Sequence, residues 1–391
     1  MNTIKKFLFL SALSAAIISC SKDDNNNSGS DKDGIITSLT DSDYNANALK
    51  GKIGANITLP VGEYILDGAL VVSSPYTLTI MPGTTFKARP GGTDVYVAVE
   101  QGAKINAAGT AAAPIKFTSN SGNPRSGDWG GILIMGKAPI SGGGSATTEV
   151  VDFTFGGSDA ADNSGTLTYV VVEYTGARIN SDKEFNGFTF YGVGSGTTVN
   201  NIVSKYGDDD AIEFFGGTVN VTNLLVVNAK DDMFDYTQGY SGTIDNAYGI
   251  REFGYNDASN DPRGIEGDGN FDGLSPTQSG QSNPTMTNIT IVSNSVVSLS
   301  DVVKVRRNSK GTFTNIFVSL GASAPAPNDF VDCTDGAGDA DGATTITIIG
   351  TGTNLDINDN KAGVNNATIN ASSGTSGGAN ITAFGWTGYF I

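Results

Sequence analysis

A five-residue pattern of polar and apolar positions recurs six times between residues 186 and 333. Its first residue is polar or charged, its third is apolar, its fourth is polar, and its fifth is apolar or small. Because side chains alternate between the two faces of a strand, residues one, three and five should share a face that points into a core. The fourth residue should then point into solvent. The units are Asn186–Phe190, Asp210–Phe214, Asp232–Tyr236, Arg263–Gly267, Asp301–Val305 and Asp329–Cys333.

The spacing of these units predicts a solenoid. Successive units begin 24, 22, 31, 38 and 28 residues apart, and the longer steps contain inserts rich in Gly, Pro, Asn and Ser. Such spacing is typical of a coil that carries loops on some of its turns. Stacked turns place equivalent residues about 4.8 Å apart. The fourth residues should therefore form a mostly acidic ladder on the outside of the coil: Thr189, Glu213, Asp235, Glu266, Lys304 and Asp332.

The rest of the chain favours the same architecture. Short stretches rich in Val, Ile and Thr begin near residue 50, turns such as Pro82-Gly83 separate them, and no stretch has a convincing helical period. Asparagines that follow several strands, such as Asn223 and Asn246, are expected to stack inside a turn. We predict an all-β, single-domain, right-handed parallel β-helix over residues 50–334. The last turns and a C-terminal cap should occupy 335–391, because exposed strand edges need cover. Residues 141–166 should form a protruding loop.

The N-terminus has the pattern of an export signal. Residues 1–19 contain Lys5, Lys6 and an apolar run too short to span a membrane. The stretch from Ile17 to Cys20 resembles the lipobox of bacterial lipoproteins, which implies cleavage before Cys20 and acylation of Cys20. The polar stretch that follows predicts a flexible tether over 20–49.

Its Lys22-Asp23-Asp24 run resembles the surface-export signal of Bacteroidota lipoproteins. The predicted location is therefore the bacterial outer membrane, with the domain lipid-anchored and facing the exterior. A plain solvated linker on a periplasm-facing anchor is the alternative.

Charge and composition narrow the possible functions. The formal net charge is −17, and loss of Lys5 and Lys6 would make it −19. Nucleic acid is therefore a poor partner, whereas cations and neutral polymers are better ones. The chain has no histidine, which excludes Ser-His-Asp and Cys-His catalysis and a histidine base. Cys333, a fifth residue, should be a small buried group rather than a disulfide partner of Cys20.

The densest candidate chemistry lies in the second and third units. Like charges on adjacent turns repel, so Ca²⁺, internal basic partners or solvent must offset them. The internal partners would be Arg263, Lys304, Arg306 and Arg307, with Lys304 balancing Glu266 and neighbouring acids. The predicted binding residues are Asp209, Glu213, Asp231, Asp235, Glu266 and Lys304. The predicted metal ligands are Asp209, Asp210, Glu213, Asp231, Asp232 and Asp235.

The same acids also permit an enzyme hypothesis. The run Gly207–Ile212 superficially resembles the paired-aspartate motif of polygalacturonases, but those enzymes also carry a Gly-His-Gly motif, which this chain lacks. A Ca²⁺-dependent lyase could use Lys304, Arg306 or Arg307 as its base. No catalytic residue is assigned on this basis, and we favour a function without catalysis.

Several segments resemble a family of Bacteroidota surface or secreted β-helix proteins. They are Phe155–Val170, Val172–Gly176, Gly192–Thr198, Asp209–Asn220 and Tyr240–Gly242. The resemblance implies the fold and a cell-envelope location, and no reaction. Arg263 departs from the family pattern, which has an Asn-Gly-Phe-Glu run there, so a cation site at that turn is not expected. The predicted function is a surface lipoprotein whose acidic, loop-flanked face binds a glycan, an envelope protein or Ca²⁺. The alternatives are a Ca²⁺-dependent polysaccharide lyase or glycoside hydrolase, and a scaffold subunit of an outer-membrane complex.

Overall fold

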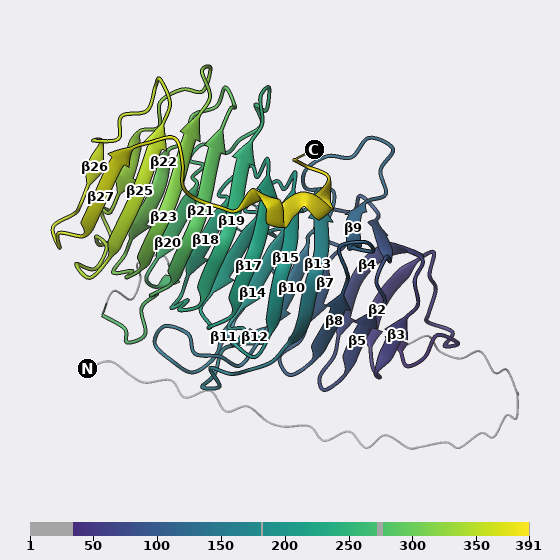
Figure 1. Cartoon of the computed structure of the whole chain (residues 1–391). Helices are drawn as coiled ribbons and strands as arrows, with labels where there is room; N and C mark the ends of the chain where they lie inside the picture. The colour runs from purple at the N-terminus through teal and green to yellow at the C-terminus, as the bar shows by residue number, and fades with distance from the viewer. Residues whose placement is uncertain (1–33, 181–182, 272–276, 391) are drawn as a thin grey trace, which may run out of the picture. The chain divides into compact units, whose positions relative to one another are not determined.

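A computed structural model describes residues 34–180, 183–271 and 277–390, which belong to one compact unit. The predicted signal peptide, Cys20 and the first part of the tether lie outside these residues. The long sheet is built from strands that pair in parallel with the strand one turn before and one turn after. Figure 1 shows these strands side by side along the coil. This is the predicted right-handed parallel β-helix, in which each turn buries an apolar face that it could not bury alone.

One stack of strands carries the repeated units. Its members pair in register from the N-terminal to the C-terminal end of the coil. They are β1 (Ile35–Ile36), β2 (Leu49–Ile53), the second half of β4 (Glu63–Val72), β7 (Val97–Val99), β10 (Ile132–Met135), β14 (Phe188–Tyr191), β16 (Ile212–Phe215), β18 (Phe234–Thr237), β20 (Ile265–Asp268), β22 (Asp301–Arg306), β24 (Asp329–Asp332) and β26 (Asn360–Lys361).

The other strands form the remaining faces of the coil. They include the long strands β13 (Gly165–Glu173), β15 (Thr198–Lys205), β17 (Asn220–Val227), β19 (Thr243–Arg251), β21 (Thr285–Ser293), β23 (Thr312–Leu320) and β25 (Thr345–Thr351). The shorter ones are β3 (Ile57–Leu59), β5 (Thr77–Ile80), β6 (Thr85–Ala88), β8 (Lys104–Ala108), β9 (Ile115–Ser119) and β27 (Thr368–Ser373).

The predicted asparagine stack is confirmed at a bend inside the long strands. Asn201, Asn223, Asn246, Asn288 and Asn315 all have φ between 52° and 59°. This left-handed conformation is one that asparagine tolerates well among non-glycine residues. The side-chain amides of these residues link successive turns; Asn246 donates to Asn223 at 2.6 Å, for example. Each long strand changes direction at this bend, so its two parts lie on different faces of the coil.

The core is a continuous column of apolar side chains. The third residue of every unit is buried, as predicted, for example Phe188, Ile212 and Phe234. Aromatic rings stack along the axis, with centroids 4.3 Å apart for Phe214 and Tyr240. Cys333 is buried among these side chains as expected. Among the described residues, no helix is long and apolar enough to cross a membrane.

Both ends of the domain differ from the prediction. The tether was expected to extend to residue 49, but β1 pairs with β2, and Ile36 is fully buried. The folded unit therefore begins earlier, because residues 34–48 cover the first turn. At the other end, the final segment does not cap the last turn.

Residues 378–390, the C-terminal strap, instead run back along the side of the coil (Figure 1). Their 3₁₀ helix η2 (Ile381–Thr387) buries Phe384 against Val203, Leu225 and Val227. The asparagine stack binds the backbone of the strap, since Asn380 donates its N–H to Oδ1 of Asn246 at 2.6 Å. The strap lies there because outward-facing valines and leucines on β15 and β17 give its aromatic residues an apolar surface.

The predicted loop 141–166 contains a small hairpin of β11 (Ala146–Thr147) and β12 (Thr154–Phe155). It does not protrude freely. Phe155 is buried together with Tyr191 and Phe215, which are outward-facing residues of the unit-bearing stack. The hairpin is therefore folded against the outer face of the coil, beside the predicted ladder.

Candidate cation-binding face

The fourth residues of the six units form one ladder, as predicted. The strand pairing places Glu213 opposite Asp235, Asp235 opposite Glu266, and Glu266 opposite Lys304. Thr189 precedes this series, and Asp332 and Lys361 extend it. The repeat spacing therefore predicted which side chains face one another on successive turns.

The expectation that this ladder faces open solvent is wrong. The side chain of Glu266 is 15% exposed, and that of Asp332 is 6% exposed. Loops on both sides cover the face. Ser259, from the loop after β19, donates its hydroxyl to Asp231 at 2.6 Å. On the other side, the β11–β12 hairpin packs Phe155 against Tyr191 and Phe215, and burial raises the pKa of Glu213, with smaller contributions from Asp235 and from Glu149 of this hairpin. The ladder is thus a row of largely buried charges, for which desolvation is costly.

The first residues of the units also lie where alternation did not place them. Asp210 and Asp232 were expected to point into the core, but their carboxylates join those of the fourth residues on the outer side. The strands begin only at Ile212 and Phe234, so each aspartate belongs to the bend before its strand. Asp210 accepts the N–H of Asp232 at 2.8 Å, and Asp232 accepts the N–H of Arg263. These two acids therefore link one turn to the next.

The C-terminal half of the ladder is neutralised internally. Arg263 Nε lies 3.1 Å from Asp301, and Lys304 Nζ lies 2.6 Å from Asp332. Glu266 contacts Arg263 and Arg306 rather than Lys304, which corrects the predicted partner. Burial opposes ionisation of Glu266, but Arg306 and Arg263 outweigh it and lower its pKa.

Arg306 and Arg307 both bind Asp268, at 2.8 and 2.7 Å. These two arginines therefore have carboxylate partners of their own. The predicted internal balancing of the acids is confirmed for this half of the ladder.

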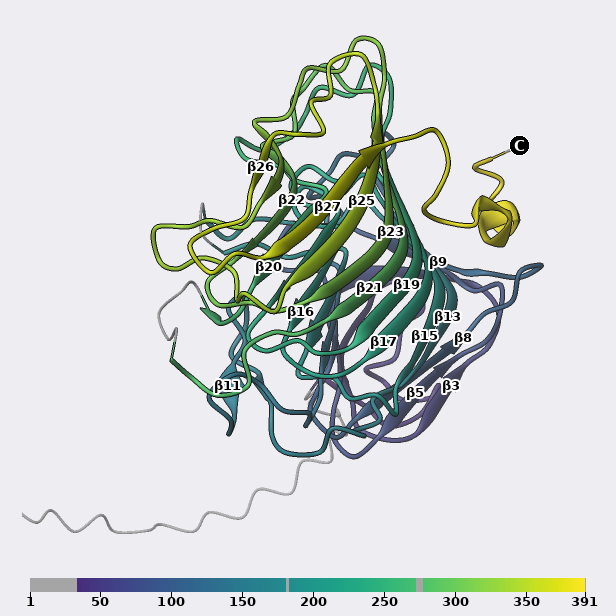
Figure 2. The same ribbon diagram turned by 60° about the vertical axis from the view of Figure 1, so that its left-hand side comes forward.

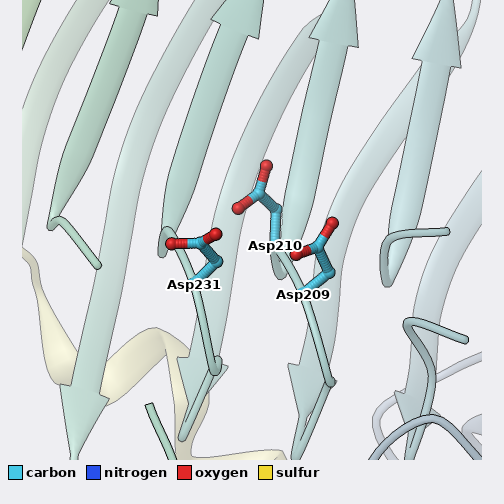
Figure 3. A group of neighbouring side chains, drawn as sticks. All are labelled: Asp209, Asp210 and Asp231. Carbon is cyan, nitrogen blue, oxygen red and sulfur yellow. The ribbon is translucent and has the colours of Figure 1, made fainter. Parts of the chain in front are cut away.

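The N-terminal half has far less positive charge. Oxygen atoms of Asp210, Glu213 and Asp235 lie within 4.8 Å of one another. Within residues 34–180, 183–271 and 277–390, no lysine or arginine lies within ion-pair distance of these three carboxylates. A second group joins Asp209, Asp210 and Asp231, and Figure 3 shows these side chains gathered from two successive turns. Arg178 reaches only the Asp209 member of that group, at 3.1 Å.

Burial and mutual repulsion make full ionisation of this half unfavourable. Burial raises the pKa of Asp210, Glu213, Asp232 and Asp235 well above the ordinary range, and neighbouring carboxylates raise each further. Burial also raises the pKa of Asp209, where Asp231 adds to the shift and Arg178 opposes it. The pKa of Asp231 is raised by burial, and its hydrogen bond to Ser259 opposes the change. Either protons or a bound cation must therefore offset these charges.

Asn186 adds an independent observation at this half of the ladder. It is the first residue of the first unit, and its side chain is almost fully buried, at 1% exposure. Its Nδ2 donates to Glu213 at 2.6 Å, whereas its Oδ1 is buried without a hydrogen-bond partner among the described residues. Leaving a buried carbonyl oxygen unpaired is costly. Because Asn186 contacts Glu213, a cation held by Asp210, Glu213 and Asp235 would lie beside this side chain.

The donor set fits a hard divalent cation. Carboxylate and amide oxygens are the ligands that Ca²⁺ prefers, and the described group offers both kinds. The side chains that would hold the ion are Asp210, Glu213, Asp235 and Asn186. Among the predicted site residues, Glu266 and Lys304 belong to the neutralised half and not to this group.

Sequence reasoning missed three contributors to this face. Asn186 was identified as part of a unit but not as a ligand, although its alignment with Asp210 in the repeat could have indicated one. Arg178, which binds Glu184, Asp208 and Asp209, lies in a loop outside the repeat. Glu149 also comes from a loop. Their positions depend on how loops fold over the coil, and no local pattern marks them.

Residues 51–389 match the family model of the pectate-lyase-like β-helix domain. The match covers most of the chain, and the chain therefore belongs to this family. No curated protein matches the chain, and neither does any solved structure. Family membership is compatible with polysaccharide binding and also with lyase or hydrolase activity.

Proposed function

We propose that this β-helix binds Ca²⁺ through Asp210, Glu213, Asp235 and Asn186, and uses the ion to hold a polysaccharide at the bacterial surface. The observation that carries the proposal is the contrast between the two halves of one ladder. Acids of the C-terminal half have basic partners, whereas Asp210, Glu213 and Asp235 share a site without one among the described residues. Buried carboxylates at such distances favour a divalent cation over solvent as their counter-charge.

The ion would supply positive charge and free coordination positions that oxygen atoms of a sugar can fill. The residues of this chain supply the ligands for the ion and the cover over the site. The carboxylates bind the ion, Asn186 offers its buried Oδ1, and the loops that contain Glu149 and Ser259 limit the access of water. Limited water access strengthens each electrostatic interaction at the site.

Binding is favoured over turnover because the candidate bases are occupied. Lys304 pairs with Asp332, Arg306 with Glu266 and Asp268, and Arg307 with Asp268. Burial opposes charge on Arg306, but Glu266 and Asp268 outweigh it and raise its pKa, so it holds its proton firmly. A lyase needs a basic group that can give up its proton at the reacting carbon. These three residues are held instead as counter-ions.

Isothermal titration calorimetry with CaCl₂ tests the cation site. We expect saturable binding to the wild type and strongly weakened binding to Asp235→Asn. The control is Asp94→Asn, which removes one exposed negative charge elsewhere on the coil and should bind Ca²⁺ like the wild type. Equal binding by Asp235→Asn and the wild type would overturn the proposed site.

Affinity electrophoresis through gels that contain acidic or neutral polysaccharides tests the second step. Retardation should require Ca²⁺ and should be lost in chelator and in Asp235→Asn. Retardation that survives chelator would place polysaccharide binding elsewhere on the coil. Calcium binding with no retardation by any glycan would favour an envelope protein as the partner.

The proposed address is the outer membrane, with the domain exposed to the exterior through a lipid on Cys20. Metabolic labelling with radioactive palmitate should mark the wild type and not Cys20→Ser. Proteinase K added to intact cells should digest the wild type if the domain faces outward. Protection from the protease in intact cells, with digestion after lysis, would instead indicate a periplasm-facing anchor.

A further inference from the structure

The C-terminal end of the coil is an open sheet edge. β27 pairs with β25, and β26 pairs with β24. Among the described residues, no strand pairs with the outer edges of β26 and β27. Figure 2 shows both strands at the front of the coil, while the C-terminal strap lies off to one side. Unpaired backbone groups on such an edge are a template for another strand.

The N-terminal end is partly covered, in contrast. β1 pairs with β2, and Ile36 and Leu49 are fully buried. Tyr44 and Ala46 also pack against the core of the first turns. Beside this covered part, β3 pairs only with β5, so its three-residue outer edge has no strand partner among the described residues. The six-residue β27 at the C-terminal end therefore presents the longer free edge.

The backbone of β27 shows which groups are free. Thr368 and Gly374 donate their N–H groups to carbonyl oxygens of Thr344 and Gly350 on the turn before. Successive residues of a strand direct these groups to opposite edges. The N–H and C=O groups of Ile369 and Ala371 therefore point to the open edge.

This edge lacks the features that normally prevent strand pairing. Charged side chains, Pro and bulges protect most exposed edges. β27 contains neither a charged residue nor Pro, and no charged residue follows Lys361 in a chain whose formal net charge is −17. Apolar side chains are also exposed here: Val364 is 83% exposed, and Ile369, Leu355 and Ile357 are only partly buried.

We infer that this end binds a second copy of the chain, through antiparallel pairing of β27 with β27 of the copy about a two-fold axis. β27 itself has no charged side chain and can face its own copy without repulsion, which the acidic flanks of the molecule cannot do. The exposed acids of the last turn, Asp356 and Asp359, precede β26 and are not part of β27. Head-to-tail stacking is disfavoured because residues 34–48 cover part of the N-terminal end of a copy, which leaves only the short outer edges of β1 and β3 among the described strands there. Pairing of the two open ends is isologous, so it closes at a dimer and does not extend into a fibre.

Sedimentation velocity over a range of concentrations tests this inference. The full chain would carry Cys20→Ser, so that no acyl chain contributes to association. We expect a reversible dimer. Asn370→Glu adds a negative charge on β27 of each copy, and like charges on facing strands should weaken the dimer roughly tenfold. Thr347→Glu is the matched control, since Thr347 pairs with Asn370 from the strand one turn inside and is also exposed. It should leave the dimer unchanged.

An equimolar mixture of Asn370→Glu and Asn370→Lys should restore association, because the facing charges then attract. Circular dichroism would confirm that each variant is folded. A wild type that stays monomeric at every concentration would overturn the inference. So would equal association of Asn370→Glu and the wild type, or equal weakening by Thr347→Glu, since either result places the contact elsewhere. Capture of a different protein by a monomeric chain would assign the edge to that partner instead.

Discussion

Glu213 and Asp235 lie directly opposite each other on successive turns and share a hydrogen bond. That bond raises the pKa of Glu213, in addition to the larger effect of burial, and it opposes the rise for Asp235. In the absence of a cation, the pair formed by Glu213 and Asp235 therefore favours binding of a proton. A Ca²⁺ ion and this proton compete for the same oxygens.

This competition predicts a specific dependence of stability on pH. A carboxyl group whose pKa is higher in the folded state binds protons more tightly when folded, so acidification stabilises the fold. In chelator, the melting temperature should rise as the pH falls from 8 towards 5, above the range in which unfolded carboxylates titrate. The stabilisation by Ca²⁺ should shrink over the same range. Thermal unfolding monitored by circular dichroism at each pH would check both trends. A melting temperature in chelator that falls on acidification would contradict them.

The variant Asp235→Asn should have opposite effects with and without calcium. It removes one of three crowded negative charges, so in chelator it should stabilise the fold by roughly 1 kcal/mol, the value of about one pKa unit. It should also lose most of the roughly 2.7 kcal/mol that a ligand at a hundredfold excess over its dissociation constant supplies. Thermal unfolding in both buffers measures these changes. Asp94→Asn serves as the control and should alter neither. Loss of stability in both buffers would indicate a purely structural role for Asp235.

Loss of Lys304 should destabilise the fold strongly. Its ammonium group lies 2.6 Å from Asp332, and both side chains are largely buried. Lys304→Met would leave that carboxylate poorly compensated, at a cost of about 3 kcal/mol in the free energy of unfolding. Lys50→Met breaks an ion pair with Asp67 in which the lysine side chain is 57% exposed, and it should cost less than about 1 kcal/mol. Urea denaturation compares the two, and equal costs would show that burial is not what makes Lys304 important.

Cys333 should be unreactive in the folded protein. Burial raises the pKa of its thiol to about 12, so almost no thiolate is present at neutral pH. In a Cys20→Ser background, Ellman's reagent should react with Cys333 only as fast as the protein unfolds. Rapid labelling under native conditions, at a rate independent of urea at low concentration, would contradict this expectation.

The C-terminal strap should be anchored by one aromatic side chain. Phe384 is fully buried against Val203 and Leu225. Phe384→Ala should therefore cost about 3 kcal/mol in the stability of the strap. Ile381→Ala, at a half-exposed position of the same helix, should cost little. Fluorescence of Trp386, whose ring packs edge-on against Tyr169, reports strap release. Unchanged emission from Phe384→Ala would show that the backbone contacts with the asparagine stack are sufficient to hold the strap.

The repeat pattern alone was sufficient to predict the coil and the register of its ladder. Apolar third residues and polar fourth residues recur with a spacing of one turn, and backbone hydrogen bonds between turns bring equivalent residues together. The order Glu213, Asp235, Glu266, Lys304 and Asp332 therefore follows from the repeat alone. Local alternation correctly placed Cys333 and the apolar third residues in the core. It failed for Asp210 and Asp232, because these residues precede their strands.

The surroundings of that ladder depend on contacts between segments that are distant in the sequence. The segments that contain Glu149, Arg178 and Ser259 fold over the coil from loops outside the repeat, so periodicity says nothing about where they lie. Asn186 lies inside a unit, but it is burial that leaves its side-chain oxygen without a hydrogen-bond partner among the described residues. Likewise, the strap follows the apolar flank of β15 and β17 instead of covering β27, because burial of Phe384 depends on a surface formed by distant strands. Contacts between distant segments, which no local pattern encodes, thus distinguish a neutralised half of the ladder from one suited to a cation.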